Sequence, residues 1–144
     1  MTEETVMKHL INIVLATTLL FAGNLFAHHS FVAEFDSNKP IVLQGIVTKV
    51  EWTNPHVWIY LNVKNEETGE VVNWGAELGP PHGLQRRGWR RNTLSIGTQI
   101  TVNGFLARNG SSRVNARNVT LTGTGGAPGQ TLDAESSIGS GQQN

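Results

Sequence analysis

Apolar and polar positions alternate most regularly in residues 56–63, directly after an Asn-Pro pair. One set of alternate positions is aliphatic, namely Val57, Ile59, Leu61 and Val63. The other set is His56, Trp58, Tyr60 and Asn62. Because successive side chains of a strand point to opposite faces, this pattern predicts a strand whose aliphatic face lies in the core. A fully solvated face rarely keeps two large aromatic rings, so the opposite face is a candidate binding surface.

The preceding segment, residues 41–52, is rich in β-branched and aromatic residues and predicts another strand. Residues 53–55 form a corner between the two strands, because proline has no amide proton and restricts the asparagine before it. The apolar alternation changes phase near Gly45, which a β-bulge or a sharp bend at this glycine explains. The residues that define the two phases are Ile41 and Leu43 before the change and Ile46, Val50 and Trp52 after it.

Three further strands and one short helix are predicted in the rest of the chain. Paired prolines at positions 80 and 81 exclude a strand there, but proline can begin a short helix, and Gly88 can end it. The elements expected are a strand at 71–78, a helix within 79–89, and strands at 98–107 and 113–122. Three strands, a helix and two strands is the order of the OB fold, so we expect an all-β, five-stranded, OB-like Greek-key barrel. An immunoglobulin-like sandwich would need about two more strands.

Residues 1–27 have the features of a signal peptide. Lys8 gives the basic region, residues 10–22 the apolar stretch, and Ala27 the small residue at a cleavage site. The acidic residues before Met7 are unusual in such a segment, so we expect translation to begin at Met7. The apolar run is shorter than the roughly 20 residues of a spanning helix, which argues against the alternative of an uncleaved anchor. The sequence therefore predicts a periplasmic protein with no stable membrane span after cleavage.

Cleavage after Ala27 would leave an N-terminal arm at 28–40, a barrel at 41–122 and a tail at 123–144. The tail consists mainly of Gly, Ser, Gln, Thr and Ala, so we expect it to be disordered. A chain of 144 residues with these ends has room for one small domain. We expect a monomer.

Composition narrows the possible chemistry. The absence of cysteine excludes disulfides, thiolate nucleophiles and cysteine-ligated metals. Lys and Arg together number 11 and so do Asp and Glu, so the chain as a whole is not a basic surface. Basic and aromatic residues on an OB-like barrel suit single-stranded nucleic acid, but an exported protein meets little of it, and nucleic acid is not expected as a partner.

Catalytic signals are weak. The sequence has no nucleophile elbow, phosphate loop or zinc-binding helix motif. Four carboxylates are available, but nothing in the sequence pairs them: Glu34, Asp36, Glu51 and Glu77. A module that binds a small molecule or an envelope protein is therefore favoured over an enzyme.

Histidines offer an alternative function. After cleavage, His28 would carry a free α-amine beside its imidazole, and His29 would follow it. An amine and imidazoles form a nitrogen set that suits Cu(II), with His29, His56 or His82 as the third ligand. In the alternative reading, the two terminal histidines bind nothing specific. His56 begins a strand after Asn-Pro, where a hydrogen bond that caps the corner is the commoner role of a histidine.

The aromatic residues and the arginines each have two interpretations. Trp58 and Tyr60 stack a flat or cyclic ligand, or else Phe31 and Phe35 of the N-terminal arm cover them. The arginines near the predicted helix end clamp a phosphate or a carboxylate, or else they complement the helix dipole and stay solvated. These arginines are Arg86, Arg87, Arg90 and Arg91.

Four motifs resemble those of an uncharacterised family of small exported bacterial proteins. They are His-His-Ser-Phe followed by Glu-Phe-Asp (28–36), Trp-Thr-Asn-Pro-His (52–56), Glu-Leu-Gly-Pro-Pro (77–81) and Arg-Arg-Gly-Trp (86–89). The resemblance implies export and a small β-barrel, and it implies no activity. The predicted strand order is similar to that of periplasmic bacterial OB-fold proteins regarded as binders of small ligands. The glycine-rich tail departs from the family.

Overall fold

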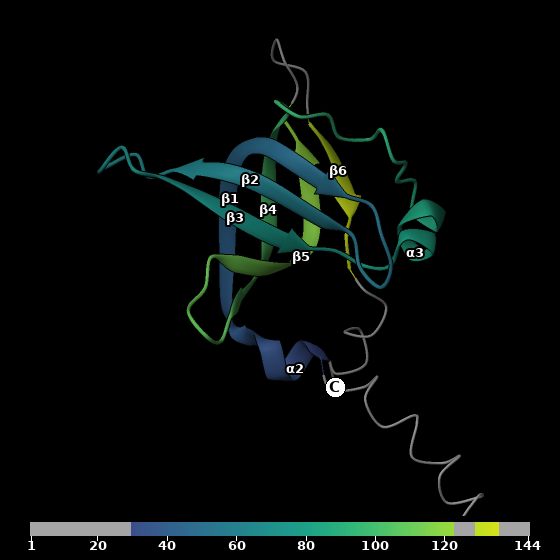
Figure 1. Cartoon of the computed structure of the whole chain (residues 1–144), viewed down its shortest axis with the longest axis horizontal. Helices are drawn as coiled ribbons and strands as arrows, with labels where there is room; N and C mark the ends of the chain where they lie inside the picture. The colour runs from purple at the N-terminus through teal and green to yellow at the C-terminus, as the bar shows by residue number, and fades with distance from the viewer. Residues whose placement is uncertain (1–29, 123–128, 136–144) are drawn as a thin grey trace, which may run out of the picture. The chain divides into compact units, whose positions relative to one another are not determined.

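The computed structural model describes residues 30–122 and 129–135 (Figure 1). All of them except Ser30 belong to one compact unit, Phe31–Asn144. The described part is mostly β, as the sequence predicts. It contains the helices α2 (Ser30–Glu34) and α3 (Pro81–Arg86) and the strands β1 (Phe35–Glu51), β2 (Trp58–Lys64), β3 (Val71–Glu77), β4 (Gln99–Ala107), β5 (Arg113–Leu121) and β6 (Gln130–Asp133).

The strands form one hydrogen-bonded sheet with the order β3-β2-β1-β4-β5-β6. Neighbours in this order run antiparallel. β3 also pairs with β5 in parallel, at Gly75 with Arg113 and Glu77 with Asn115, so that five strands close a ring of hydrogen bonds. This closure brings the start of β5 at Arg113 beside the end of β3 at Glu77, although 35 residues of the sequence, 78–112, lie between them.

The core lies inside this ring and follows the predicted alternation. Val57, Ile59 and Leu61 are fully buried, and Val63 packs against the same cluster from a partly buried position. Ile100 and Val102 of β4 face the same core, as does Trp74 of β3 at its margin. The strand predictions for β2 to β5 are therefore confirmed to within about two residues, because their alternating faces are a local property of the sequence.

β1 differs from the prediction in its start and in the place of its phase change. It begins at Phe35, so the second half of the expected arm is part of the sheet, and Phe35 pairs with Ala107. The register shifts between Val47 and Lys49, and Ile46 is exposed, so the bulge is not at Gly45. Gly45 instead lies so close to β2 that a Cβ atom would overlap the carbonyl of Asn62.

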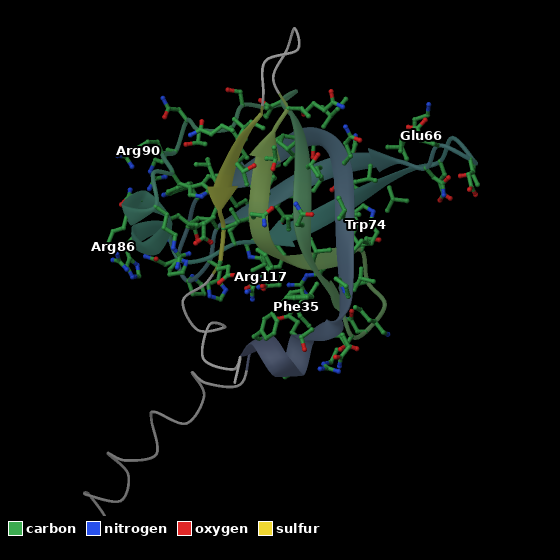
Figure 2. The ribbon with its side chains drawn as sticks, turned by 180° about the vertical axis from the view of Figure 1, so that it is seen from behind. Phe35, Glu66, Trp74, Arg86, Arg90 and Arg117 are labelled. Carbon is green, nitrogen blue, oxygen red and sulfur yellow. The ribbon has the colours of Figure 1, made fainter. Side chains whose placement is uncertain are left out.

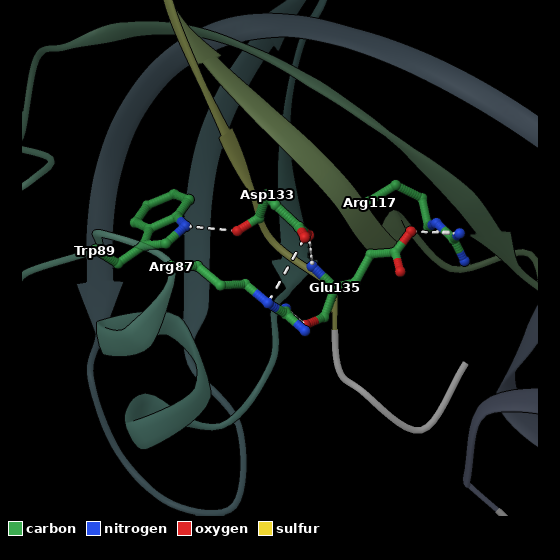
Figure 3. Close-up of polar contacts among 5 residues, drawn as sticks. All are labelled: Arg87, Trp89, Arg117, Asp133 and Glu135. Carbon is green, nitrogen blue, oxygen red and sulfur yellow. Dashed lines mark hydrogen bonds and ion pairs between the residues drawn. The ribbon is translucent and has the colours of Figure 1, made fainter. Parts of the chain in front are cut away.

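Part of the expected disordered tail is a strand. β6 pairs with β5, and Leu132 and Ala134 are buried in the core. Figure 3 shows its side contacts: the indole Nε1 of Trp89 donates to the carbonyl of Asp133 at 2.7 Å, and Arg87 bonds the carbonyl of Glu135. Residues 1–29, 123–128 and 136–144, with the predicted signal peptide, lie outside the described residues.

The predicted helix after β3 is present as α3. Pro81 lies in its first turn, and its C-cap is Arg87, one residue before Gly88. Leu84 and Trp89 anchor this helix in the core, because both are buried. In the two described ranges, no helix has the length and apolar character needed to cross a membrane.

Candidate functional site

Trp58 and Tyr60 lie on the outer face of β2, as predicted. Their rings are nearly parallel, with an interplanar angle of 24° and centroids 6.4 Å apart. The ring pairs that the arm forms lie elsewhere: Phe31 packs on Phe35 and on Phe105, with ring centroids 6.0 and 6.2 Å apart respectively. These ring pairs do not support the alternative in which the arm phenylalanines cover Trp58 and Tyr60.

Two cations flank the ring pair instead. The guanidinium of Arg113 lies 4.6 Å from the centroid of the Trp58 ring, and Nζ of Lys49 lies 5.3 Å from the centroid of the Tyr60 ring. Cations over aromatic faces are attracted by the ring quadrupole. Each cation also has a carboxylate partner: Arg113 Nη1 lies 2.7 Å from Glu34 Oε1, and Lys49 pairs with Glu51. The ring pair is thus part of an ordered and electrically balanced surface.

Hydrogen bonding extends this order to the phenol of Tyr60, which donates to Glu51 Oε2 at 3.0 Å. Burial raises the pKa of Tyr60 above its ordinary value, and the hydrogen bond to Glu51 raises it further. The hydrogen bonds from Lys49 and then from Tyr60 lower the pKa of Glu51. The pKa of Lys49 is raised, first through its hydrogen bond to the same carboxylate.

A depression of about 500 Å³ lies beside the two rings. It is lined by Trp58, Tyr60, Asn73, Gly75, Ser112 and Arg113. Gly75 is paired with Tyr60 across the strands. A Cβ atom at this glycine would lie 3.5 Å from the Trp58 ring and 3.6 Å from the Tyr60 ring, which is ordinary contact. Because Gly75 has no side chain, its backbone forms the floor of the depression.

His56 and Glu77 form a pair next to this face. Nδ1 of His56 contacts Oε1 of Glu77, and Glu77 is itself opposite Trp58 in the β2–β3 register. Burial raises the pKa of Glu77, whereas His56 opposes that rise. The corner before β2 is therefore tied to the end of β3 by a buried carboxylate and an imidazole.

The four arginines after β3 do not converge on one site. Arg87 faces Asp133 and the carbonyl of Glu135, Arg90 donates to the carbonyls of Gln85 and Trp89, and Arg91 donates to the carbonyl of Trp52. Arg86 lines a depression of about 340 Å³ with His82, Gln85 and Arg90. Figure 2 shows Arg86 and Arg90 beside α3, far from the hairpin tip at Glu66. Neither Arg86 nor Arg87, both candidates for binding an anion, lines the depression beside Trp58 and Tyr60.

The predicted copper ligands are only partly described. His28 and His29 lie outside the described residues. Within the described ranges, no group of three or more His, Cys, Asp or Glu side chains could hold a metal ion. His56 contacts Glu77, and His82 lies on α3. Copper binding through the terminal amine of His28 stays a prediction.

Sequence reasoning missed Arg113, Ser112 and Gly75. Arg113 and Ser112 reach the ring pair only because β5 joins β3 in parallel, and no local pattern reports that pairing. Gly75 had a signal, since a glycine inside a strand often marks the close approach of a ligand or another backbone.

Comparison with known proteins places the chain in a family. No curated protein and no solved structure matches the sequence. The model of the Family of unknown function (DUF6152) matches residues 17–116, which is more than half of the chain. This match also includes the region that contains the ring pair and the depression. The chain therefore belongs to the Family of unknown function (DUF6152).

Proposed function

We propose that this chain is an exported periplasmic module that binds a small molecule on the outer face of β2 and β3. The proposal treats the closed ring of strands as an OB-like barrel. It is supported by the strand order β3-β2-β1-β4-β5 and by the parallel pairing of β3 with β5. In an OB fold, the face of strands 2 and 3 is the usual binding surface, and that face carries Trp58, Tyr60 and Gly75 here.

The observation that carries the proposal is the space above Gly75. Glycine inside a strand weakens the strand, so its presence needs a reason. At Gly45 and Gly104 the packing of the sheet itself requires glycine, because a Cβ atom would overlap the backbone of a neighbouring strand. At Gly75 no such overlap exists, and the nearest atoms belong to the two aromatic rings at ordinary contact distance. A ligand that occupies this space accounts for the glycine.

The substitution Gly75→Ala tests this account because it separates stability from binding. Alanine fits without strain, so we expect the free energy of unfolding to stay equal or to rise by about 0.4 to 1 kcal/mol. We expect binding to fall, because the new methyl group occupies the floor. Tyr60 is the only tyrosine in the chain, so selective ¹³C labelling of tyrosine rings reports on this site with one residue.

The measurement is a screen of small aromatic, polyhydroxylated and ionic compounds against the labelled protein. We expect at least one compound to shift the Tyr60 ring signals and to lose affinity in Gly75→Ala. Gln44→Ala is the control, since Gln44 is exposed on β1 and does not line the depression. If no compound shifts the Tyr60 signals, or if Gly75→Ala binds as well as the natural chain, the proposed site is wrong.

A further inference from the structure

The charges around the depression are already compensated. The guanidinium of Arg113 is paired with Glu34 at 2.7 Å, and Lys49 is paired with Glu51. An anion that bound Arg113 would lie near the carboxylate of Glu34, which repels it. A cationic ligand beside the two rings would be repelled by Arg113 and Lys49, which already lie over them. Both comparisons favour an uncharged ligand.

The polar groups that line the depression are not saturated. Asn73 donates from Nδ2 to Thr48 Oγ1 at 3.0 Å and to Asn62 Oδ1 at 2.8 Å, which leaves its carbonyl oxygen as an acceptor. Within the described ranges, the hydroxyl of Ser112 has no hydrogen-bond partner, and one guanidinium nitrogen of Arg113 meets Glu34. Ser112 and Arg113 therefore offer donors, while Asn73 and Ser112 offer acceptors.

We infer that the ligand of this site is an uncharged saccharide ring, an inference that rests on the proposed function. The hydroxyl groups of a sugar both donate and accept, which matches the mixed groups of Asn73, Ser112 and Arg113. The C–H surface of the ring packs against the aromatic carbons beside Gly75, where Trp58 and Tyr60 flank the floor. An aromatic ligand without hydroxyls would remove the same polar groups from water without replacing their hydrogen bonds, which is unfavourable.

The test is a titration of the tyrosine-labelled protein with six probes. Three are neutral disaccharides, namely maltose, cellobiose and N,N′-diacetylchitobiose, and three are comparators, namely indole, choline and inorganic phosphate. We expect at least one disaccharide to shift the Tyr60 ring signals, and none of the comparators to do so at the same concentration. Asn73→Ala should lower the affinity for that disaccharide about threefold to tenfold, which is the range expected for the loss of one hydrogen bond.

Asn103→Ala is the matched control. Asn103 donates to Asn118 Oδ1 at 2.7 Å across β4 and β5, as Asn73 does to Asn62 across β3 and β2, but it does not line the depression. Equal losses of disaccharide affinity in Asn73→Ala and Asn103→Ala would show that Asn73 does not bind the saccharide directly. If indole, choline or phosphate shifts Tyr60 and no disaccharide does, the site stands and the saccharide inference is overturned. If none of the probes binds, the saccharide inference is overturned, while the wider compound screen still decides the proposed function.

Discussion

At the scale of single residues, the pair formed by His56 and Glu77 is the most consequential contact near the candidate site. Glu77 is buried, and a buried carboxylate is costly unless a partner compensates for its lost hydration. His56 provides that partner from the corner before β2. Arg113 also lowers the pKa of Glu77, whereas Glu34 raises it. Removing His56 would therefore leave the buried carboxylate of Glu77 without the partner that ties the corner before β2 to β3.

We expect His56→Ala to lower the free energy of unfolding by roughly 3 to 5 kcal/mol at pH 8, because it leaves a buried carboxylate without its imidazole. The loss should be smaller at pH 5. Burial raises the pKa of Glu77, and removing His56 raises it further, so the native state binds more protons than the unfolded state. Stability that depends on this proton is present at low pH and is lost as the pH rises through the folded pKa. Urea denaturation at the two pH values measures the difference.

Two variants sharpen this measurement. Combining Glu77→Gln with His56→Ala removes the ionisable carboxyl group. In the Glu77→Gln background, the loss of unfolding free energy caused by His56→Ala should therefore be the same at pH 5 and at pH 8. His82→Ala is the control for a general effect of losing a histidine, since His82 is exposed on α3. A loss in His56→Ala that is equal at both pH values would show that the pair contributes only packing.

At the scale of elements, β6 completes the core beside α3. Leu132 and Ala134 are buried, and the amide of Ala134 donates to the carbonyl of Arg117 at 2.9 Å. The carbonyl of Ala134 accepts from the amide of Gly79 at 2.9 Å, so one residue joins β5 to the segment that enters α3. Arg117 adds an ion pair with Glu135 (Figure 3). β6 is therefore expected to stabilise the whole sheet.

We expect Leu132→Ala to lower the free energy of unfolding by about 2 to 5 kcal/mol, the range for a leucine lost from a core. Gln130→Ala is the control on the same strand, because Gln130 is exposed, and its effect should stay within about 0.5 kcal/mol. Thermal and urea unfolding measure both variants. Equal stability of Leu132→Ala and the natural chain would mean that β6 is detached in solution.

At the scale of the whole molecule, the closed ring of strands assembles a site from the β2–β3 hairpin and the distant strand β5. β2 brings Trp58 and Tyr60, β3 brings Gly75, and β5 brings Arg113. Glu34 of α2 then pairs with Arg113. The segment before β1 therefore orders a cation that lies on the Trp58 ring, which links the start of the described chain to the candidate site.

Export is a prediction about the whole chain. We expect the protein isolated from its native envelope to begin at His28, because residues 10–22 and Ala27 have the pattern of a cleaved signal peptide. Intact-mass spectrometry of the isolated protein measures this directly. A chain that retains Met1 or Met7 would contradict cleavage and would also remove the free amine on which copper binding at His28 depends.

The sequence by itself determined the features that depend on neighbouring residues. The outward position of Trp58 and Tyr60 follows from alternation, and the helix at Pro81 follows from proline chemistry, because both are local properties of the backbone. Only the tertiary structure decided the bulge between Val47 and Lys49, because a bulge depends on the partner strand.

Long-range pairing decided the remainder of the site. His56 meets Glu77 across 21 residues, and Arg113 reaches Trp58 through the parallel closure of β3 with β5. β6 likewise follows Gly129 in a mostly polar stretch, and Leu132 and the following Ala134 are buried although no local pattern predicts it, because β6 pairs with β5 at the edge of the core. A sequence pattern reports which way a side chain points within its own element, whereas its partner depends on how distant elements pack.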